Sequence, residues 1–169
     1  MNRPFDHCTK CGARLVAGEW PNRCPECGAT HYLNPFPVSV LIQPVEDGLL
    51  TVRRAIDPGR GKLALPGGFI DVGESWQEAA VRELAEETSV AVQSGQVELF
   101  DAVSAPDGTV LIFGVAPSIS TDRLSSFEPS DEVAELVVLR EPMELAFPIH
   151  TEVVARWFRR RDQDQEGSR

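Results

Sequence analysis

The sequence predicts an α/β (α+β) fold, preceded by a small N-terminal unit that holds a metal ion. Short apolar stretches lie on both sides of an uninterrupted amphipathic segment at residues 76–88, and this order predicts strands that flank a helix. Two Cys-x-x-Cys pairs near the N-terminus predict a metal-bound unit that is too small to fold on a core of its own. The 169 residues are enough for one medium domain and such an appendage.

The N-terminal segment contains all four cysteines of the chain: Cys8, Cys11, Cys24 and Cys27. Four thiolates in two Cys-x-x-Cys pairs suit tetrahedral zinc. The alternative is a pair of disulfides, which needs an oxidising compartment, and no export signal precedes the cysteines. We therefore expect residues 1–34 to form a zinc ribbon with a structural or dimer-forming role. His7 and His31 flank the cysteines, but four sulfurs already complete a closed site.

Charge and hydropathy restrict the partners. The net charge is −10, and the ribbon has no basic stripe with interleaved aromatic residues, so we expect no nucleic-acid partner. The chain has no run of 18 apolar residues and no apolar signal core at its N-terminus. We expect no membrane partner and a cytoplasmic location.

The larger domain is predicted from alternating strand and turn signals. Asn34-Pro35-Phe36-Pro37 predicts a stiff joint after the ribbon. Apolar runs predict five strands, an apolar stripe predicts a final helix, and a polar stretch with prolines predicts a loop. The expected strands are residues 38–42, 49–53, 97–103, 110–115 and 136–139; the loop is 117–131, and the helix is 148–160.

The central helix carries the clearest chemical signal. Ser75 and Glu78 form a capping box at its start, and no Gly or Pro interrupts residues 76–88. At helical spacing, Glu83, Glu86 and Glu87 fall on one side. These like charges repel, and a divalent cation removes that cost because Mg²⁺ prefers carboxylate oxygens. Taken alone, the three acids are also compatible with an ordinary solvated helix face.

The wider spacing adds a family resemblance. Gly68 is followed after five residues by Glu74, after seven more by Arg82-Glu83-Leu84, then after one residue by Glu86-Glu87, with apolar Val90 beyond. This pattern closely resembles the signature of the Nudix hydrolases. The resemblance implies an α/β/α sandwich with a mixed sheet over residues 35–161. The polar residues 162–169 at the end of the chain are expected to form a disordered tail. One position departs from the pattern, since the family usually has Gly where this chain has Ser89.

The resemblance also implies a metal site and a set of catalytic groups. Mg²⁺ or Mn²⁺ would be bound by the three acids of the helix and by the backbone carbonyl of Gly68. An acid just before the last strand would supply a further ligand or the general base; Glu132 is the first choice and Glu135 the second, unless both are surface acids. Glu86 or Glu132 would take the proton of an attacking water. Arg82 would orient a neighbouring carboxylate with support from Glu74. The expected catalytic and metal-binding side chains are therefore Arg82, Glu83, Glu86, Glu87 and Glu132.

Cations near the helix are candidates for substrate binding. Arg53 and Arg54 end a predicted strand, and we expect one of them at the rim of the sheet. Arg60 and Lys62 lie in the loop at 57–62, which is either a phosphate contact or a solvated tip. Phe69 follows the paired glycines that lead into the helix, and it completes the expected substrate-binding set.

A zinc ribbon joined to a Nudix domain narrows the expected substrates. The chain lacks the Pro/Trp-rich segment that is usual in NADH pyrophosphatases, and it resembles compact enzymes that act on FAD or ADP-ribose. We expect hydrolysis of a diphosphate bond in such a nucleoside diphosphate derivative. The alternatives are an NADH/NAD pyrophosphatase, an enzyme that removes damaged nucleoside triphosphates, and a non-catalytic regulator that senses ADP-ribose or a nucleotide. A homodimer is common in this family.

Overall fold

The structure is a computed structural model that describes residues 6–16 and 20–167, with side chains described up to residue 164. The chain forms two compact units that divide between Pro35 and Phe36, one residue after the boundary expected from the sequence. Within the described residues, no helix combines the length and the apolar character needed to cross a membrane.

The first unit is built from two similar turns and a short hairpin. Strand β1 (Asn22–Arg23) pairs antiparallel with β2 (Thr30–His31). The N–H group of Gly12 donates to the carbonyl of Cys8, and that of Gly28 donates to the carbonyl of Cys24. Both glycines have a left-handed backbone, with φ of 76° and 71°, which costs Gly little. The sequence therefore folds both Cys-x-x-Cys pairs into the same type of turn.

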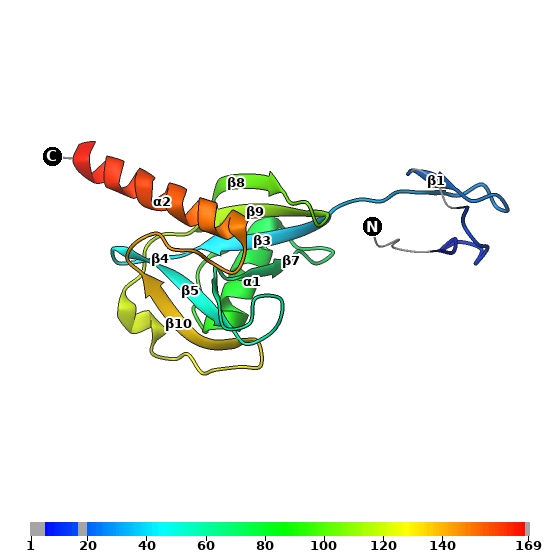
Figure 1. Ribbon diagram of the computed structural model, residues 1–169. Coiled ribbons are helices and arrows are strands. Elements are labelled where there is room, and N and C mark those ends of the chain that lie inside the picture. Colours follow the sequence, from blue (N-terminus) through cyan, green and yellow to red (C-terminus); the bar gives the residue numbers. More distant parts are fainter. Residues whose placement is uncertain (1–5, 17–19, 168–169) are drawn as a thin grey trace. The chain divides into compact units, whose positions relative to one another are not determined.

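The second unit contains two four-stranded sheets (Figure 1). The first has the order β7-β3-β9-β8 and is mixed, because β3 runs parallel to β9 whereas the other neighbours are antiparallel. The second has the order β10-β5-β4, with β6 also paired to β5, and is antiparallel. The strands are β3 (Phe36–Ile42), β4 (Pro44–Val45), β5 (Gly48–Arg54), β6 (Leu63–Ala64), β7 (Gly67–Phe69), β8 (Glu98–Ser104), β9 (Thr109–Val115) and β10 (Val133–Leu139).

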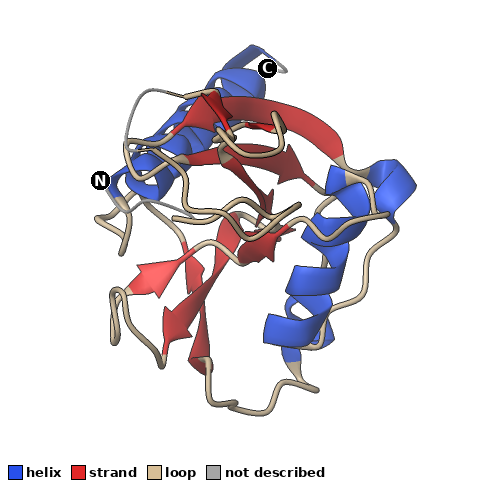
Figure 2. Cartoon of the chain, turned by 90° about the vertical axis from the view of Figure 1, so that its right-hand side faces the viewer, coloured by secondary structure: helices blue, strands red, loops and turns tan. Residues whose placement is uncertain are grey.

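Two helices cover different sides of the strands (Figure 2). Alternate residues of β3 explain this, because successive side chains of a strand point to opposite faces. Val40 and Ile42 pack in one core with the apolar stripe of α2 (Pro148–Gly167). Leu41 packs in a second core with Leu84 of α1 (Trp76–Thr88). The predicted α/β/α arrangement with mixed strands is confirmed.

Comparison with the sequence prediction shows which helices and strands can be predicted from local sequence signals. Every expected strand is present with ends within three residues of the prediction, and α1 has the predicted bounds. Strands β4, β6 and β7 were not predicted because they are only two or three residues long, and β4 and β7 also contain Pro or adjacent glycines. Short 3-10 helices occur at Ser94–Gln96 and, within the expected loop, at Thr121–Leu124.

The C-terminal helix corrects the predicted tail. Residues 162–169 were expected to be disordered, but α2 continues to Gly167. Polar residues with good helix propensity follow Arg161 without an intervening Gly or Pro, so nothing ends the helix earlier. Residues 168–169 lie outside the described residues.

Both ends of α1 are fixed by identifiable groups. The Ser75 hydroxyl accepts a hydrogen bond from the N–H of Glu78 at 3.2 Å, and the Glu78 carboxylate accepts one from the N–H of Ser75 at 2.7 Å. At the other end Ser89 has φ of 61° and ψ of 13°, and its N–H donates to the carbonyl of Ala85. Ser89 therefore occupies a left-handed position that usually belongs to Gly.

Replacement of Ser89 by Gly is expected to stabilise the folded chain by about 1 kcal/mol, because Gly adopts this backbone without the steric cost of a Cβ atom. The free energy of unfolding in urea measures the change. Ser120→Gly is a matched control, since Ser120 is exposed and has φ of −84° and no capping side-chain hydrogen bond. Ser120→Gly should not stabilise the chain, because Gly at this position only adds conformational freedom to the unfolded state. Stabilisation by both substitutions to the same extent, or no stabilisation by Ser89→Gly, would contradict the explanation.

Candidate active site

Four of the predicted acids surround one cavity. It has a volume of about 360 Å³ and is lined by Glu83, Glu86 and Glu87 of α1 and by the segment before β10, residues 130–132. The Ser130 hydroxyl accepts hydrogen bonds from the N–H groups of Glu132 and Val133, which fixes the turn that carries Glu132. The structure thus brings Glu132 to the acids of the helix.

Glu135, the second choice for this role, lies elsewhere. It stands opposite Arg53 of β5 and forms an ion pair with its guanidinium group at 2.5 Å. It is not among the described residues that line the acidic cavity. The geometry therefore favours Glu132 as the additional acid of the site.

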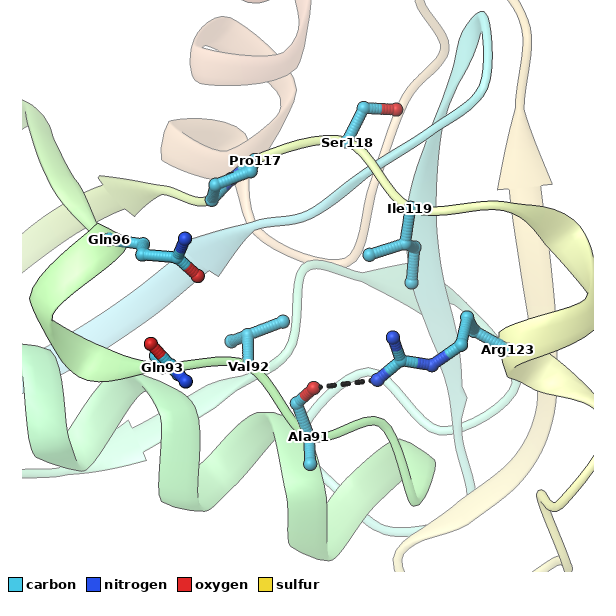
Figure 3. A pocket seen from close by; sticks show the side chains of 8 residues that line it. All are labelled: Ala91, Val92, Gln93, Gln96, Pro117, Ser118, Ile119 and Arg123. Carbon is cyan, nitrogen blue, oxygen red and sulfur yellow. Dashed lines mark hydrogen bonds between the residues drawn. The ribbon is translucent and has the colours of Figure 1, made fainter.

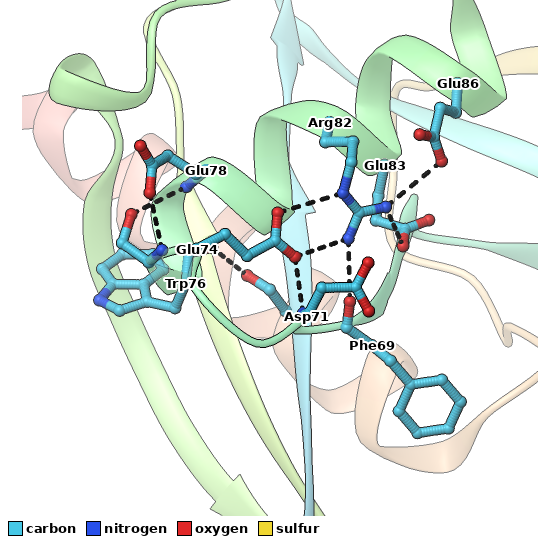
Figure 4. A network of polar contacts seen from close by, with 10 residues as sticks. Phe69, Asp71, Glu74, Trp76, Glu78, Arg82, Glu83 and Glu86 are labelled. Carbon is cyan, nitrogen blue, oxygen red and sulfur yellow. Dashed lines mark hydrogen bonds and ion pairs between the residues drawn. The ribbon is translucent and has the colours of Figure 1, made fainter.

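Arg82 ties this site together (Figure 4). It donates two hydrogen bonds to the carboxylate of Glu74, at 2.8 and 3.2 Å. It also donates to Glu83 at 2.8 Å, to Glu86 at 3.3 Å and to the carbonyl of Phe69 at 3.0 Å. The hydrogen bond to Arg82 keeps the pKa of Glu74 below its ordinary value. Arg82 is placed to orient Glu83 and Glu86, and Glu74 holds Arg82 from the other side.

The paired glycines of β7 form the wall beside two of these acids. A Cβ atom at Gly68 would lie 2.4 Å from Oε1 of Glu83, so any side chain there would displace the carboxylate. The N–H of Gly67 donates to Oε2 of Glu87 at 3.1 Å. The absence of side chains therefore lets Glu83 and Glu87 rest directly against the backbone of β7.

The electrostatics of these acids suit a cation. The pKa of Glu87 is raised to about 7, mainly by burial and also by the negative charges of Glu83 and Glu132, while the hydrogen bond from the N–H of Gly67 and the charge of Arg54 oppose the shift. Burial also raises the pKa of Glu83, although Arg82 opposes this shift. A divalent cation would favour the charged forms, and carboxylates with a nearby backbone carbonyl are the hard oxygen donors that Mg²⁺ and Mn²⁺ bind. The residues fit such an ion.

The cysteines form a tighter cluster. The Sγ atoms of Cys8 and Cys27 are 3.6 Å apart, as are those of Cys11 and Cys24. All four sulfurs lie within 4.8 Å of one another, and in the described part of the chain this is the only such group of metal-ligating side chains. Nε2 of His31 lies 3.2 Å from the sulfur of Cys8, where it contacts a ligand atom from outside the set of four. The cluster is consistent with a tetrahedral zinc site of the ribbon type.

A larger cavity shares the glycine wall. It has a volume of about 610 Å³, and Gly67, Gly68 and Phe69 of β7 line it together with Arg54 and mainly apolar side chains of β3, β9 and the loop before α2. Cavities of this size and character are typical of small-molecule sites. The acidic cavity and the apolar cavity therefore lie on two sides of the same short strand.

The predicted substrate-binding residues separate into two groups. Arg54 and Phe69 line the apolar cavity. Arg53 is held by Glu135 and by the carbonyl of Gly61, and Lys62 lies 3.9 Å from Glu144. Arg60 is exposed, and among the described lining residues of both cavities none of Arg53, Arg60 and Lys62 occurs.

His150 is the residue of this region that the sequence did not indicate. It lies in the first turn of α2, is only 5% exposed, and lines the apolar cavity. Its Nδ1 atom accepts a hydrogen bond from the N–H of Leu65 at 3.3 Å. Burial and the nearby charge of Arg54 lower its pKa to about 4, so the ring is neutral at pH 7. A single His in an apolar stretch gives no sequence signal for this position.

The low pKa of His150 makes stability depend on pH. The unfolded chain takes up this proton near pH 6.5, whereas the folded chain does so only near pH 4. The contribution of neutral His150 to the free energy of unfolding is therefore complete above pH 6.5. It is lost as the pH falls toward 4, by about 2 kcal/mol between pH 6.5 and 5. The free energy of unfolding in urea, measured at pH 6.5 and at pH 5, should fall more for the native chain than for the His150→Gln variant. Parallel profiles would contradict the assignment.

A third cavity lies near the end of α1 (Figure 3). It has a volume of about 510 Å³, and Arg123 donates a hydrogen bond to the carbonyl of Ala91 at its edge. Its described lining residues include no carboxylate and none of the residues predicted for catalysis. The geometry does not connect this cavity to the acidic site.

Two curated proteins are similar to parts of this chain. An ADP-ribose pyrophosphatase of Methanocaldococcus jannaschii is 37% identical over 76 residues, which cover 45% of this chain and 44% of that protein. NAD-capped RNA hydrolase ndx-9 of Caenorhabditis elegans is 27% identical over 136 residues, which cover 78% of this chain and 36% of that protein. The chain thus aligns with less than half the length of either curated relative.

A solved structure and a family model each match most of this chain. The crystal structure of a NUDIX hydrolase from Nitrosomonas europaea has a TM-score of 0.76 and 26% identity, and the match covers 94% of this chain and 93% of that one. The NUDIX domain model matches residues 34–162, which include α1, most of α2 and the residues of the acidic cavity. The chain therefore belongs to the Nudix hydrolase family.

Proposed function

We propose that this protein is a Mg²⁺-dependent pyrophosphohydrolase that cleaves the diphosphate bond of a nucleoside diphosphate derivative, with FAD or ADP-ribose as the first candidates. The observation that supports this is the pair of cavities on either side of Gly67 and Gly68. The acidic cavity suits a metal-bound diphosphate, and the apolar cavity suits the organic group attached to it. The M. jannaschii relative, named as an ADP-ribose pyrophosphatase, supports the same substrate class.

The residues have separate roles in the proposed reaction. Glu83, Glu86, Glu87 and Glu132 would hold the cation, which would offset the charge of the diphosphate and lower the pKa of an attacking water. Arg82 fixes the carboxylates of Glu83 and Glu86 by charge-assisted hydrogen bonds. Glu86, whose side chain is 61% exposed, and Glu132 are the two candidates to accept the proton of the water. Glu87 is less available for this because it accepts the N–H of Gly67.

A dinucleotide of the NAD type is the second candidate substrate. The C. elegans relative, named as an NAD-capped RNA hydrolase, aligns with most of this chain. Such a substrate contains the same diphosphate between two nucleosides, so the acidic cavity would act on it in the same way. Damaged nucleoside triphosphates and a purely regulatory role rank lower, since the three helix acids are all present and no observation favours either.

The test is incubation of the purified protein with Mg²⁺ and FAD, NADH, ADP-ribose or 8-oxo-dGTP, followed by chromatography of the products. We expect AMP together with FMN or ribose 5-phosphate, and no product when divalent cations are omitted. Preference for NADH would move the NAD-type substrate to first place. Binding of these ligands without turnover at any Mg²⁺ concentration would favour the regulator instead.

A further inference from the structure

We propose that His150 is a specificity-determining residue, whose Nε2–H group donates a hydrogen bond to a planar nitrogen heterocycle bound in the apolar cavity. The inference rests on the proposed function in one respect, because the heterocycle is taken to be part of the diphosphate substrate. A purine and a flavin both contain ring nitrogens or carbonyls that would accept this hydrogen bond.

The tautomer of His150 follows from one hydrogen bond. A backbone N–H can only donate, so the N–H of Leu65 requires Nδ1 of His150 to be the acceptor. A neutral imidazole then carries its proton on Nε2. The tertiary structure therefore converts this ring into a donor with a fixed orientation.

The donor has no partner among the residues that the structure describes. In the described part of the chain, no residue forms a hydrogen bond with Nε2 of His150. Among the described side chains, Gln43 Oε1 is the one polar atom that is sealed from solvent and unpaired, so Nε2 of His150 keeps some accessible surface. Since the ring is 5% exposed and lines the apolar cavity, that surface faces the cavity. A nearly buried donor without a partner marks a place where a ligand acceptor is expected.

The surroundings of this donor suit a flat ring. Phe147 contacts the edge of His150 with ring centroids 5.1 Å apart, and the guanidinium group of Arg54 lies 5.2 Å from the centre of Phe147. Phe69 stands at the cavity with 59% of its surface exposed, although Phe36 contacts its edge. Exposed aromatic side chains and apolar walls favour a stacked aromatic ligand, and a single directional donor distinguishes ligands that carry an acceptor.

The position of the cavity relative to the acids supports the assignment. Gly67 and Gly68 line the apolar cavity, while Gly67 also donates to Glu87 and Gly68 abuts Glu83. A diphosphate at the acids would therefore place an attached nucleoside beside this wall. No residue of the acidic cavity takes part in recognising the heterocycle, so binding and hydrolysis are separable in an experiment.

The test measures binding of reaction products, which needs no turnover. The full chain is titrated calorimetrically with AMP, FMN or ribose 5-phosphate, without Mg²⁺. His150→Phe keeps an aromatic ring but removes the donor, and we expect it to weaken binding of AMP or FMN by about five- to fiftyfold. Ribose 5-phosphate has no planar nitrogen heterocycle and should bind both proteins equally. If His150→Phe weakens binding of AMP alone, the heterocycle in the cavity is a purine. If it weakens binding of FMN alone, the heterocycle is a flavin.

Thr109→Val is the matched control, because Thr109 lines the same cavity but its hydroxyl donates to Asp107 at 2.7 Å. It should change binding of AMP and FMN less than twofold. If His150→Phe binds both heterocycles as the control does, or weakens ribose 5-phosphate equally, the proposal is wrong. A protein that binds heterocycles through His150 but hydrolyses nothing would refute the proposed function and leave this inference intact.

A measurement on the native chain covers the case in which His150→Phe does not fold. Imidazole ¹H–¹⁵N spectra should show His150 as the Nε2–H tautomer, and the Nε2–H resonance should move when AMP or FMN is added but not when ribose 5-phosphate is added. Variants of His7 and His31 assign the three imidazoles. An Nε2–H resonance that is unchanged by both heterocycles would overturn the proposal.

Discussion

The Glu87→Gln variant is expected to lose hydrolytic activity by roughly two to four orders of magnitude while it keeps its fold. Glu87 lines the acidic cavity, and its carboxylate accepts the N–H of Gly67. An amide oxygen can keep this hydrogen bond, but the amide carries no charge for a divalent cation. Burial raises the pKa of the native carboxyl to about 7, so a nearby positive charge would favour its ionised form.

The measurement is kcat/KM with saturating Mg²⁺, alongside thermal unfolding of both proteins. Glu135→Gln is the matched control. Glu135 is an acid of β10, and its carboxylate forms an ion pair with Arg53 outside the acidic cavity. It should retain activity within about twofold, since an exposed ion pair contributes little. A Glu87→Gln variant as active as the Glu135→Gln control would exclude Glu87 as a metal ligand.

The Cys24→Ser variant is expected to lose its zinc and the fold of the N-terminal unit. Cys24 is buried, and its sulfur lies 3.6 Å from that of Cys11 within the cluster of four. A hydroxyl is a poor substitute for a thiolate, and zinc binding to such sites is worth on the order of 10 kcal/mol. Among the described residues of the unit, the buried apolar core consists of Cys8, Leu15 and Cys24, and two of these are the proposed zinc ligands.

Elemental analysis after dialysis measures this loss directly, and we expect about one zinc per native chain and none in the variant. Lys10→Ser is the control, since Lys10 is an exposed residue of the first turn and offers no ligand. It should retain its zinc. Retained zinc in Cys24→Ser would mean that the four sulfurs do not form one closed site.

The sequence by itself determined those features that depend on contacts between residues close to one another in the chain. The capping box, the bounds of α1 and the placement of three acids on one face follow from spacing within a single helix. The two Cys-x-x-Cys turns are likewise local, because a glycine after each pair permits the left-handed backbone. The resemblance to Nudix hydrolases was visible for the same reason, since its signature lies within one continuous segment.

Only the tertiary structure decided which groups from distant parts of the chain lie beside the segment that carries the Nudix signature. The sequence ranked Glu132 before Glu135 without deciding between them, and an irregularity in the pairing of β10 with β5 between Val133 and Glu135 sets the register that places Glu135 against Arg53. Arg53 and Arg54 alternate along one strand, so only Arg54 reaches the apolar cavity. His150 acquires its tautomer from Leu65, which is far from it in the chain. Side-chain direction in a strand and hydrogen bonds between distant segments depend on register and packing, and the sequence alone contains no local signal for either.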